Sequence, residues 1–217
     1  VYRNIQKVIQ FLVAGNIAKI LILLLAVVVG WQMPILAVHI LLINLATDSL
    51  PAVALGVDPA SANIMKHKPI KSGTLFEKGM IYRIVLHGLF ISAAALAAYW
   101  IGMLVYENHD ESMTMTFIVL SVSQLSHALN QRSNTDSIFK RGQGHNKFLL
   151  IALLASAAIV ALVVFVPPLM SLFDLVYIGW TEWLICIGLS LFPLVAVEVS
   201  KIFIRLYQKK HHVGITY

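Results

Sequence analysis

The chain has 217 residues, of which 59% are hydrophobic and only 12% are charged. Water-soluble domains are rarely so apolar, and this composition indicates an integral membrane protein. The formal net charge of +6 would suggest a nucleic-acid partner in a soluble protein, but here we attribute it to the loops and expect no nucleic acid. The single cysteine, Cys186, excludes a disulfide framework and a cysteine metal site.

Six apolar runs along the chain are each about as long as a transmembrane helix. We therefore expect an all-α, polytopic membrane protein, with one domain over residues 1–217 built as a bundle of six transmembrane helices. The runs lie at about 9–30, 35–57, 84–106, 113–129, 148–170 and 180–203. The polar, basic residues 1–7 lead directly into the first run, a pattern that argues against a cleavable signal peptide.

The basic residues predict the orientation in the membrane. Of the 16 Lys and Arg residues, all but Lys19 precede the first span, lie in loops 58–83 and 130–147, or follow the core of the last span. The opposite loops, 31–34, 107–112 and 167–179, contain no Lys or Arg. Because Lys and Arg favour the cytoplasmic side, we expect a multi-pass protein with both termini and both basic loops in the cytoplasm.

The second span contains a cluster of oxygen-bearing side chains. Asn44, Thr47 and Asp48 follow the spacing i, i+3, i+4, which places them on one face of a helix. Pro51 is expected to break the helix and to free carbonyl oxygens beside the carboxylate. A carboxylate in mid-membrane is costly unless it is paired, and such residues usually serve ion or proton pathways. The cluster provides the oxygen ligands that a hard cation requires.

Polar residues of two other spans extend this pattern. Asn16 and Lys19 share a face of the first span, and the short hairpin at residues 30–34 brings that face near Asp48. Lys19 lies deep in the apolar run, which favours pairing with Asp48, either as a purely structural ion pair or as part of a functional site. Gln124 of the fourth span is interpreted as either a packing residue or a ligand position.

The segment Asn44-Leu45-Ala46-Thr47-Asp48-Ser49-Leu50-Pro51-Ala52 resembles the sixth-helix motif of type II P-type ATPases, the calcium-pump group. Weaker similarity runs from about Arg3 to Tyr207, so the chain is similar to the last six of the ten membrane helices in such a pump. The resemblance implies that Asn44, Thr47, Asp48 and Asn16 are ligands of a transported Ca²⁺.

Two positions depart from the pattern of reticulum-type calcium pumps. Lys19 and Gln124 stand where those pumps have ion-binding glutamates. A lysine ammonium repels a divalent ion and attracts Asp48, so Lys19 is expected to be a built-in counterion and the first of two calcium sites to be lost. The expected function is therefore calcium export with one ion per cycle, in the plasma membrane.

The resemblance also implies an enzyme, an ATP-driven cation translocase. ATP and Mg²⁺ would act through phosphorylation and nucleotide domains whose motifs this chain does not contain. The expected partners are the lipid bilayer, the first four helices and those cytoplasmic domains. The alternatives are a pump for manganese, sodium or protons, and a non-catalytic membrane scaffold in which Lys19 and Asp48 form a structural pair. A six-helix channel is less favoured, because the sequence shows no selectivity filter or charged ring.

Overall fold

The computed structural model describes residues 2–59, 79–132 and 146–211. In the last range it describes side chains only as far as Phe203. Within these ranges the chain is helical and has no strand. Most of the expected basic loop 58–83 and of the loop 130–147 lies outside the described residues. The elements are α1 (Tyr2–Val29), α2 (Ala37–Leu42), the π-helix η1 (Ile43–Asp48), α3 (Ser49–Gly56), α4 (Met80–Tyr106), α5 (His109–Asn130), α6 (Lys147–Phe165), α7 (Pro167–Leu172) and α8 (Trp180–His211).

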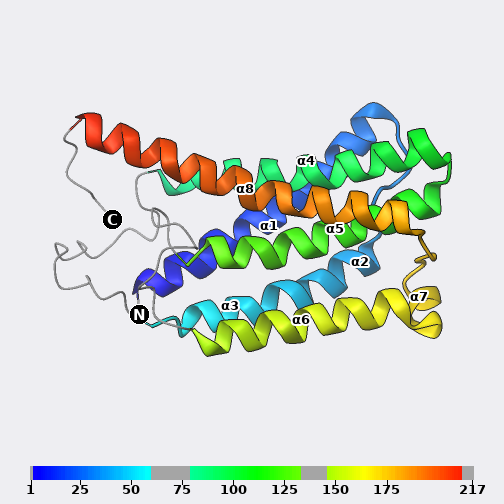
Figure 1. Cartoon of the computed structure of the whole chain (residues 1–217), viewed down its shortest axis with the longest axis horizontal. Helices are drawn as coiled ribbons and strands as arrows, with labels where there is room; N and C mark the ends of the chain where they lie inside the picture. Colours follow the sequence, from blue (N-terminus) through cyan, green and yellow to red (C-terminus); the bar gives the residue numbers. More distant parts are fainter. Residues whose placement is uncertain (1, 60–78, 133–145, 212–217) are drawn as a thin grey trace.

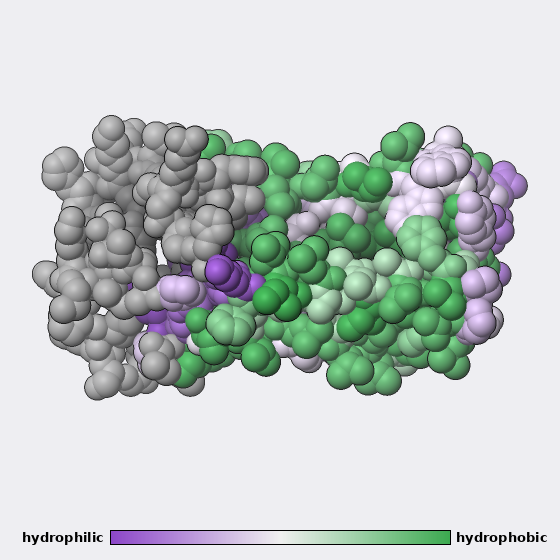
Figure 2. Space-filling view, turned by 60° about the horizontal axis from the view of Figure 1, so that its bottom comes forward, coloured by the Kyte–Doolittle hydropathy of each residue, from purple (hydrophilic) through white to green (hydrophobic). Residues whose placement is uncertain are grey.

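The long helices run side by side along the long axis of the molecule, and α5 lies among the others (Figure 1). It contacts α1, α3, η1, α4, α6 and α8. The main hydrophobic core joins α5 residues such as Phe117 and Leu120 to α1, α4, α6 and α8. Large apolar side chains also cover the outer surface, for example Leu154 and Leu162 on α6, and Figure 2 shows an apolar band between more polar ends. This is the surface that a lipid bilayer requires.

Five described helical segments are long and apolar enough to cross a membrane, by length and composition: 2–29, 37–56, 80–106, 147–165 and 180–203. The expected count of six spans is thus confirmed only for five. The remaining expected span, 113–129, coincides with α5, which has 22 residues but contains many polar side chains. Most of α5 is buried by neighbouring helices, which explains why a helix of this composition can occupy the centre of the bundle.

Two predicted spans differ locally from the structure. The expected break at Pro51 is wrong, since α2, η1 and α3 form one continuous helical segment over 37–56. Proline cannot donate to the helical ladder, and here the wider π-helical turn immediately before α3 accommodates it. The expected span 148–170 is divided, because α6 ends at Phe165 and Pro167 begins α7. Proline is favoured at such a first helical position.

Candidate functional site

The ammonium of Lys19 lies at the centre of a buried cluster formed by α1 and η1. Its Nζ donates to Oδ2 of Asp48 at 2.5 Å, to Oδ1 of Asn44, and to Oδ1 of Asn16 at 3.3 Å. Lys19 and Asp48 are only 3% and 4% exposed. The three N–H groups of the ammonium thus face three side-chain oxygens, and the opposite charges of Lys19 and Asp48 cancel. The predicted proximity of these two residues is confirmed.

The π-helix η1 determines how the chain presents Asp48. The backbone N–H of Ser49 donates to the carbonyl of Asn44, and the Ser49 hydroxyl donates to the same oxygen at 2.6 Å. The Thr47 hydroxyl donates to the carbonyl of Ile43 at 2.9 Å, so it does not belong to the hydrogen bonds around the ammonium. Short π-helical segments of this kind occur often at functional sites, where they displace a side chain from its regular helical position. The sequence pattern gave no signal for this turn.

One oxygen of the cluster remains available. Asp48 Oδ1 is buried and has no hydrogen-bond partner among the described residues. Asn16 is exposed on the outer surface of this bundle and Asn44 is partly exposed, so the cluster is open on that side. No group of three His, Cys, Asp or Glu side chains that could hold a metal occurs in the described ranges. A cation bound here would depend on one carboxylate together with amide or backbone oxygens.

Gln124 lies on α5 and is fully buried. Its side chain packs against the backbone of Gly15, where a Cβ would lie only 3.0 Å from Gln124 Oε1 and closer still to Nε2. Neither amide atom has a hydrogen-bond partner in the part of the chain that the structure describes. Gln124 therefore packs against α1 at Gly15, the residue before Asn16, and makes no hydrogen bond to the Lys19 ammonium. The ligand roles of Asn16, Asn44, Thr47 and Asp48 stay predictions.

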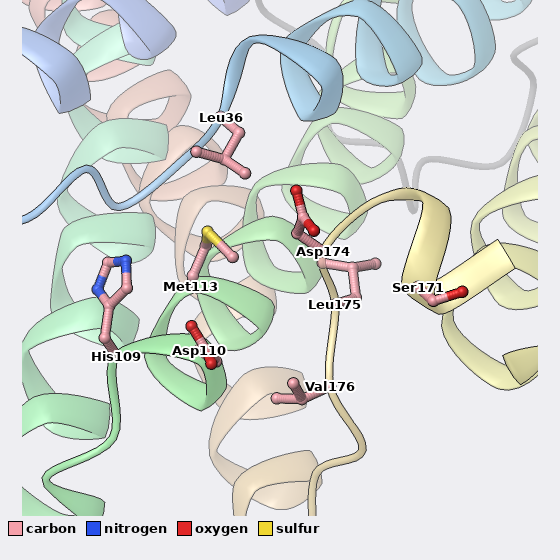
Figure 3. Close-up of a pocket in the computed structure, with 8 residues that line it drawn as sticks. All are labelled: Leu36, His109, Asp110, Met113, Ser171, Asp174, Leu175 and Val176. Carbon is pink, nitrogen blue, oxygen red and sulfur yellow. The ribbon is translucent and has the colours of Figure 1, made fainter. Parts of the chain in front are cut away.

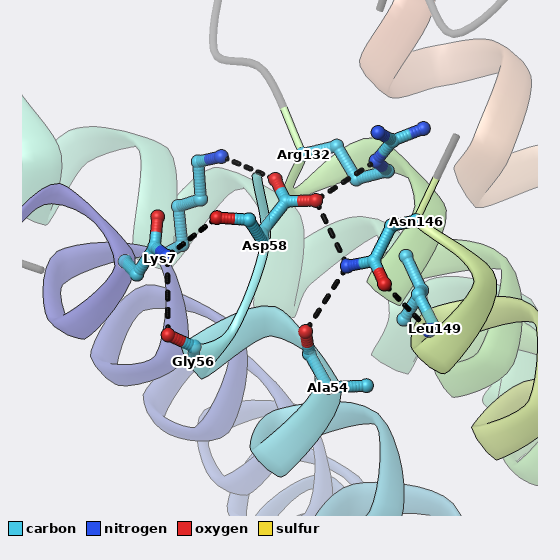
Figure 4. Close-up of polar contacts among 8 residues, drawn as sticks. Lys7, Ala54, Gly56, Asp58, Arg132, Asn146 and Leu149 are labelled. Carbon is cyan, nitrogen blue, oxygen red and sulfur yellow. Dashed lines mark hydrogen bonds and ion pairs between the residues drawn. The ribbon is translucent and has the colours of Figure 1, made fainter. Parts of the chain in front are cut away.

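A second polar cluster, which the sequence reasoning did not identify as a site, surrounds Asp58 just after α3 (Figure 4). Asp58 Oδ2 accepts from Lys7 Nζ at 2.7 Å, and Oδ1 accepts from Asn146 Nδ2 at 2.9 Å and from Arg132 Nε at 3.4 Å. Asn4 Nδ2 donates to the Asp58 carbonyl at 2.8 Å. The Asp58 carboxylate thus joins the ends of α1, α3, α5 and α6. The position of this acidic residue between basic segments of the sequence was the feature from which the cluster could have been predicted.

The opposite end of the bundle carries an open pocket of about 460 Å³ (Figure 3). Asp110 and Asp174 line it, and both are exposed. Nearby, the buried His39 accepts a hydrogen bond from the Leu36 N–H at 3.2 Å on Nδ1, and its Nε2 lies 2.6 Å from the Phe173 carbonyl. These contacts tie the start of α2 to the segment between α7 and α8, so they stabilise this end of the molecule.

Comparison of the sequence with known proteins relates the chain to a family. Residues 32–203 match the family described as "Cation transporting ATPase, C-terminus". "Calcium-transporting ATPase 1" of Bacillus cereus is 37% identical over 93% of this chain, "Calcium-transporting ATPase" of Bacillus subtilis is 35% identical over 89%, and "Calcium-transporting ATPase type 2C member 1" of Homo sapiens is 28% identical over 100%. The matches cover 24%, 22% and 24% of these relatives, so the chain spans about a quarter of their length.

Proposed function

Because the chain belongs to the C-terminal family of cation-transporting ATPases, we propose that it is the ion-binding membrane region of an ATP-driven pump that exports calcium. The observation that carries this proposal is the Lys19–Asp48 cluster, which lies inside a bundle of membrane-spanning helices. A paired, buried carboxylate at this depth is typical of ion pathways in membrane proteins. The names of the bacterial and human relatives support calcium as the transported ion.

The pump proposed here moves one calcium ion per cycle. Asp48 is the only carboxylate of the cluster, and it is paired with Lys19 in this structure. A calcium ion would have to displace the ammonium, after which Asp48 with both its oxygens, Asn44 and Asn16 would be available as ligands. Thr47 would join them only by releasing the Ile43 carbonyl. When the ion leaves, Lys19 would pair again with Asp48 and neutralise it. Gln124 provides no charge for a second divalent ion.

The open side of the cluster supports a partner within the same pump. Asn16 is exposed in the middle of α1, where an amide facing lipid would be unfavourable. The first four membrane helices of the pump would cover this face and complete the coordination of the ion. ATP and Mg²⁺ would act only through the cytoplasmic domains of the longer protein. In this arrangement α5 also crosses the membrane, as the fourth of six spans, both termini are cytoplasmic, and the protein lies in the plasma membrane.

A pump for a monovalent cation or a proton is the second candidate. The observation that favours it is the same ammonium, because a single positive charge at Nζ already satisfies Asp48 and both amides. A divalent ion must displace the ammonium and adds a second positive charge to the cluster, whereas a monovalent ion carries the same charge as the ammonium that it replaces. A manganese pump would use the same oxygen ligands as a calcium pump, and a scaffold would keep the ion pair permanently closed.

The test uses the full-length pump with Asp48→Asn, which keeps the shape of the side chain and removes its charge. We expect calcium-dependent phosphorylation from ATP to be lost, and equilibrium calcium binding by the unmodified pump to saturate at one ion per molecule. Asp174→Asn is the matched control, because Asp174 is an exposed acid near the opposite end of the bundle. Normal calcium affinity of Asp48→Asn would refute the ligand assignment, and two bound ions would refute the stoichiometry. Phosphorylation driven by sodium, manganese or pH alone would favour another cation.

A further inference from the structure

The hydroxyl of Ser156 joins α6 to the π-helix η1. Its Oγ donates to the carbonyl oxygen of Ala46 at 2.5 Å, and the side chain is fully buried. Over residues 148–165, α6 has no other polar side chain. A hydroxyl in a helix commonly donates to the carbonyl four residues earlier in the same helix, as Ser190 does to Cys186 at 2.6 Å. Ser156 instead reaches a neighbouring segment, so its hydroxyl serves the backbone of η1.

The backbone of this segment has too few N–H donors for its carbonyls. The N–H of Ser49 donates to the carbonyl of Asn44, and the carbonyl of Asp48, the N-cap of α3, begins the α-helical hydrogen bonding. The carbonyls of residues 45–47 lie between these two. The two residues that follow Ser49 offer them only one N–H, because the second is Pro51. A buried carbonyl without a donor is costly, so a donor from outside the helix is needed, and the hydroxyl of α6 supplies it.

This bond lies between the two η1 residues that belong to the cation cluster. Asn44 and Asp48 both accept from the Lys19 ammonium, and Ala46 is midway between them in the sequence. Side chains four residues apart lie on one face of an α-helix, whereas the wider turn of a π-helix displaces them relative to each other. A change of register in η1 would therefore change how the amide and the carboxylate meet a cation. The bond from Ser156 holds this register from outside the cluster.

The two helices that hold η1 reach it from different sides. In Figure 1, α3 lies between α1 and α6, and it contacts both of them. Lys19 reaches η1 from α1, whereas Ser156 reaches it from α6. The proton of the Ser156 hydroxyl is used for a backbone carbonyl, so this residue acts on the cluster through η1 and not as a ligand of the ion.

We propose that Ser156 is a positioning residue of the cation site: its hydroxyl takes the place of the backbone N–H that Pro51 lacks and keeps η1 in its π-helical register. That register presents Asn44 and Asp48 together to the cation. Without the hydroxyl, the Ala46 carbonyl stays buried without this donor, which favours other registers of η1. This inference rests on the proposed function, because it assigns to α6 a part in setting the calcium affinity of the same site.

The first test measures phosphorylation of the full-length pump from ATP as a function of the calcium concentration. We expect Ser156→Ala to need about tenfold more calcium for half-maximal phosphorylation, which corresponds to about 1.4 kcal/mol, and to reach the same maximal level at saturating calcium. Ser190→Ala is the matched control, because it also removes a buried serine hydroxyl, but one that bonds within α8. An unchanged calcium requirement in Ser156→Ala, or an equal shift in both variants, would overturn the proposal. So would a lower maximal level without a shift.

Pro51→Ala tests whether the hydroxyl replaces a missing backbone donor. This change returns an N–H to the segment, so adding Ser156→Ala to it should raise the calcium requirement by less than about threefold. The double variant also covers the case in which Ser156→Ala alone does not fold, because the restored N–H should allow it to fold. A double variant that fails to fold, or a full tenfold shift on adding Ser156→Ala, would overturn the proposal.

A calcium-free measurement separates this inference from the proposed function. In thermal unfolding without calcium, Ser156→Ala should lower the melting temperature more when position 51 is proline than when Pro51→Ala is also present. Equal losses would mean that the hydroxyl and the proline act independently and would overturn the inference. If the unmodified pump bound no calcium, the proposed function would fail, and the unfolding comparison would still decide whether Ser156 supports the backbone of η1.

Discussion

Replacing Lys19 by methionine is the most informative perturbation of the cluster. Methionine retains most of the length of the side chain but removes the three hydrogen bonds that the ammonium donates. Asp48 is then left 4% exposed, with Oδ1 already unpartnered and Oδ2 newly so. Removing one partner of a buried ion pair typically costs about 3–5 kcal/mol, because the other charge is left uncompensated. For a domain of this size, such a loss lowers the melting temperature by on the order of 10 °C.

The assay compares thermal unfolding of the purified pump with Lys19→Met, with Asp48→Asn, and with both changes. We expect the double variant to recover most of the loss, since it leaves no unpaired charge in the cluster and a neutral buried pair is often as stable as an ionic one. Asp48→Asn alone should cost less than Lys19→Met, because the ammonium keeps the oxygens of Asn16 and Asn44.

Calcium supplies a second arm of the same experiment. In Lys19→Met the ion no longer competes with an ammonium, so it should stabilise this variant more than the unmodified pump. At a calcium concentration of 100 times Kd the gain is about 2.7 kcal/mol. Additive effects of the two single changes would refute the reasoning, because they would show that Lys19 and Asp48 do not interact. Equal stabilisation of both proteins by calcium would refute the claim that the ammonium occupies the place of the ion.

Two further predictions concern the surroundings of the cluster. Gly15→Ala should destabilise the protein by about 1–3 kcal/mol, because its Cβ would overlap the buried Gln124 amide, and the added change Gln124→Ala should restore much of the loss. Thermal unfolding measures both effects, with Gly188→Ala as the control, because a Cβ at Gly188 meets no atom within 4 Å. Equal effects at both glycines would contradict the packing argument. Asp58→Asn should lower the free energy of unfolding by about 1–3 kcal/mol, because it weakens the contacts of Lys7 and Arg132 while an oxygen remains for Asn146. Asp110→Asn is the control at an exposed acid. If Lys7→Met added its full effect to that of Asp58→Asn, the two residues would not form an ion pair.

The residues of the cation cluster could be predicted from the sequence because each is an exception to its surroundings. Asp48 and Lys19 are charged residues inside apolar runs, and the hairpin at 30–34 is too short to let their helices separate. The similar depth of Lys19 and Asp48 in the membrane and their pairing follow from those two facts. The π-helix η1 could not be predicted in this way, because it depends on how the backbone before Pro51 accommodates the missing N–H, and many arrangements satisfy the same spacing.

The polar contacts at the helix ends were harder to foresee. Asp58 collects donors that lie 51, 74 and 88 residues away along the chain. No local pattern carries such separations, since they depend on which helix ends meet in the folded bundle. Gln124 was recognised by its type, but its contact with Gly15 depends on how closely α1 and α5 approach. The lengths of the apolar runs located five of the spans, because the thickness of the bilayer imposes that length.

The polar composition of α5 has a consequence for the assembly of the protein in the membrane. A helix with so many buried hydroxyl, amide and imidazole groups gains little by entering lipid alone, since each of these groups would face hydrocarbon. It is joined to the strongly apolar α4 by a short turn capped by Asn108, and Gly102 lets the two helices approach so closely that a Cβ there would meet Ser112. The two helices are thus suited to enter the bilayer together as a hairpin, with α4 supplying the hydrophobicity that α5 lacks. During biosynthesis, α5 would then depend on its neighbour for insertion.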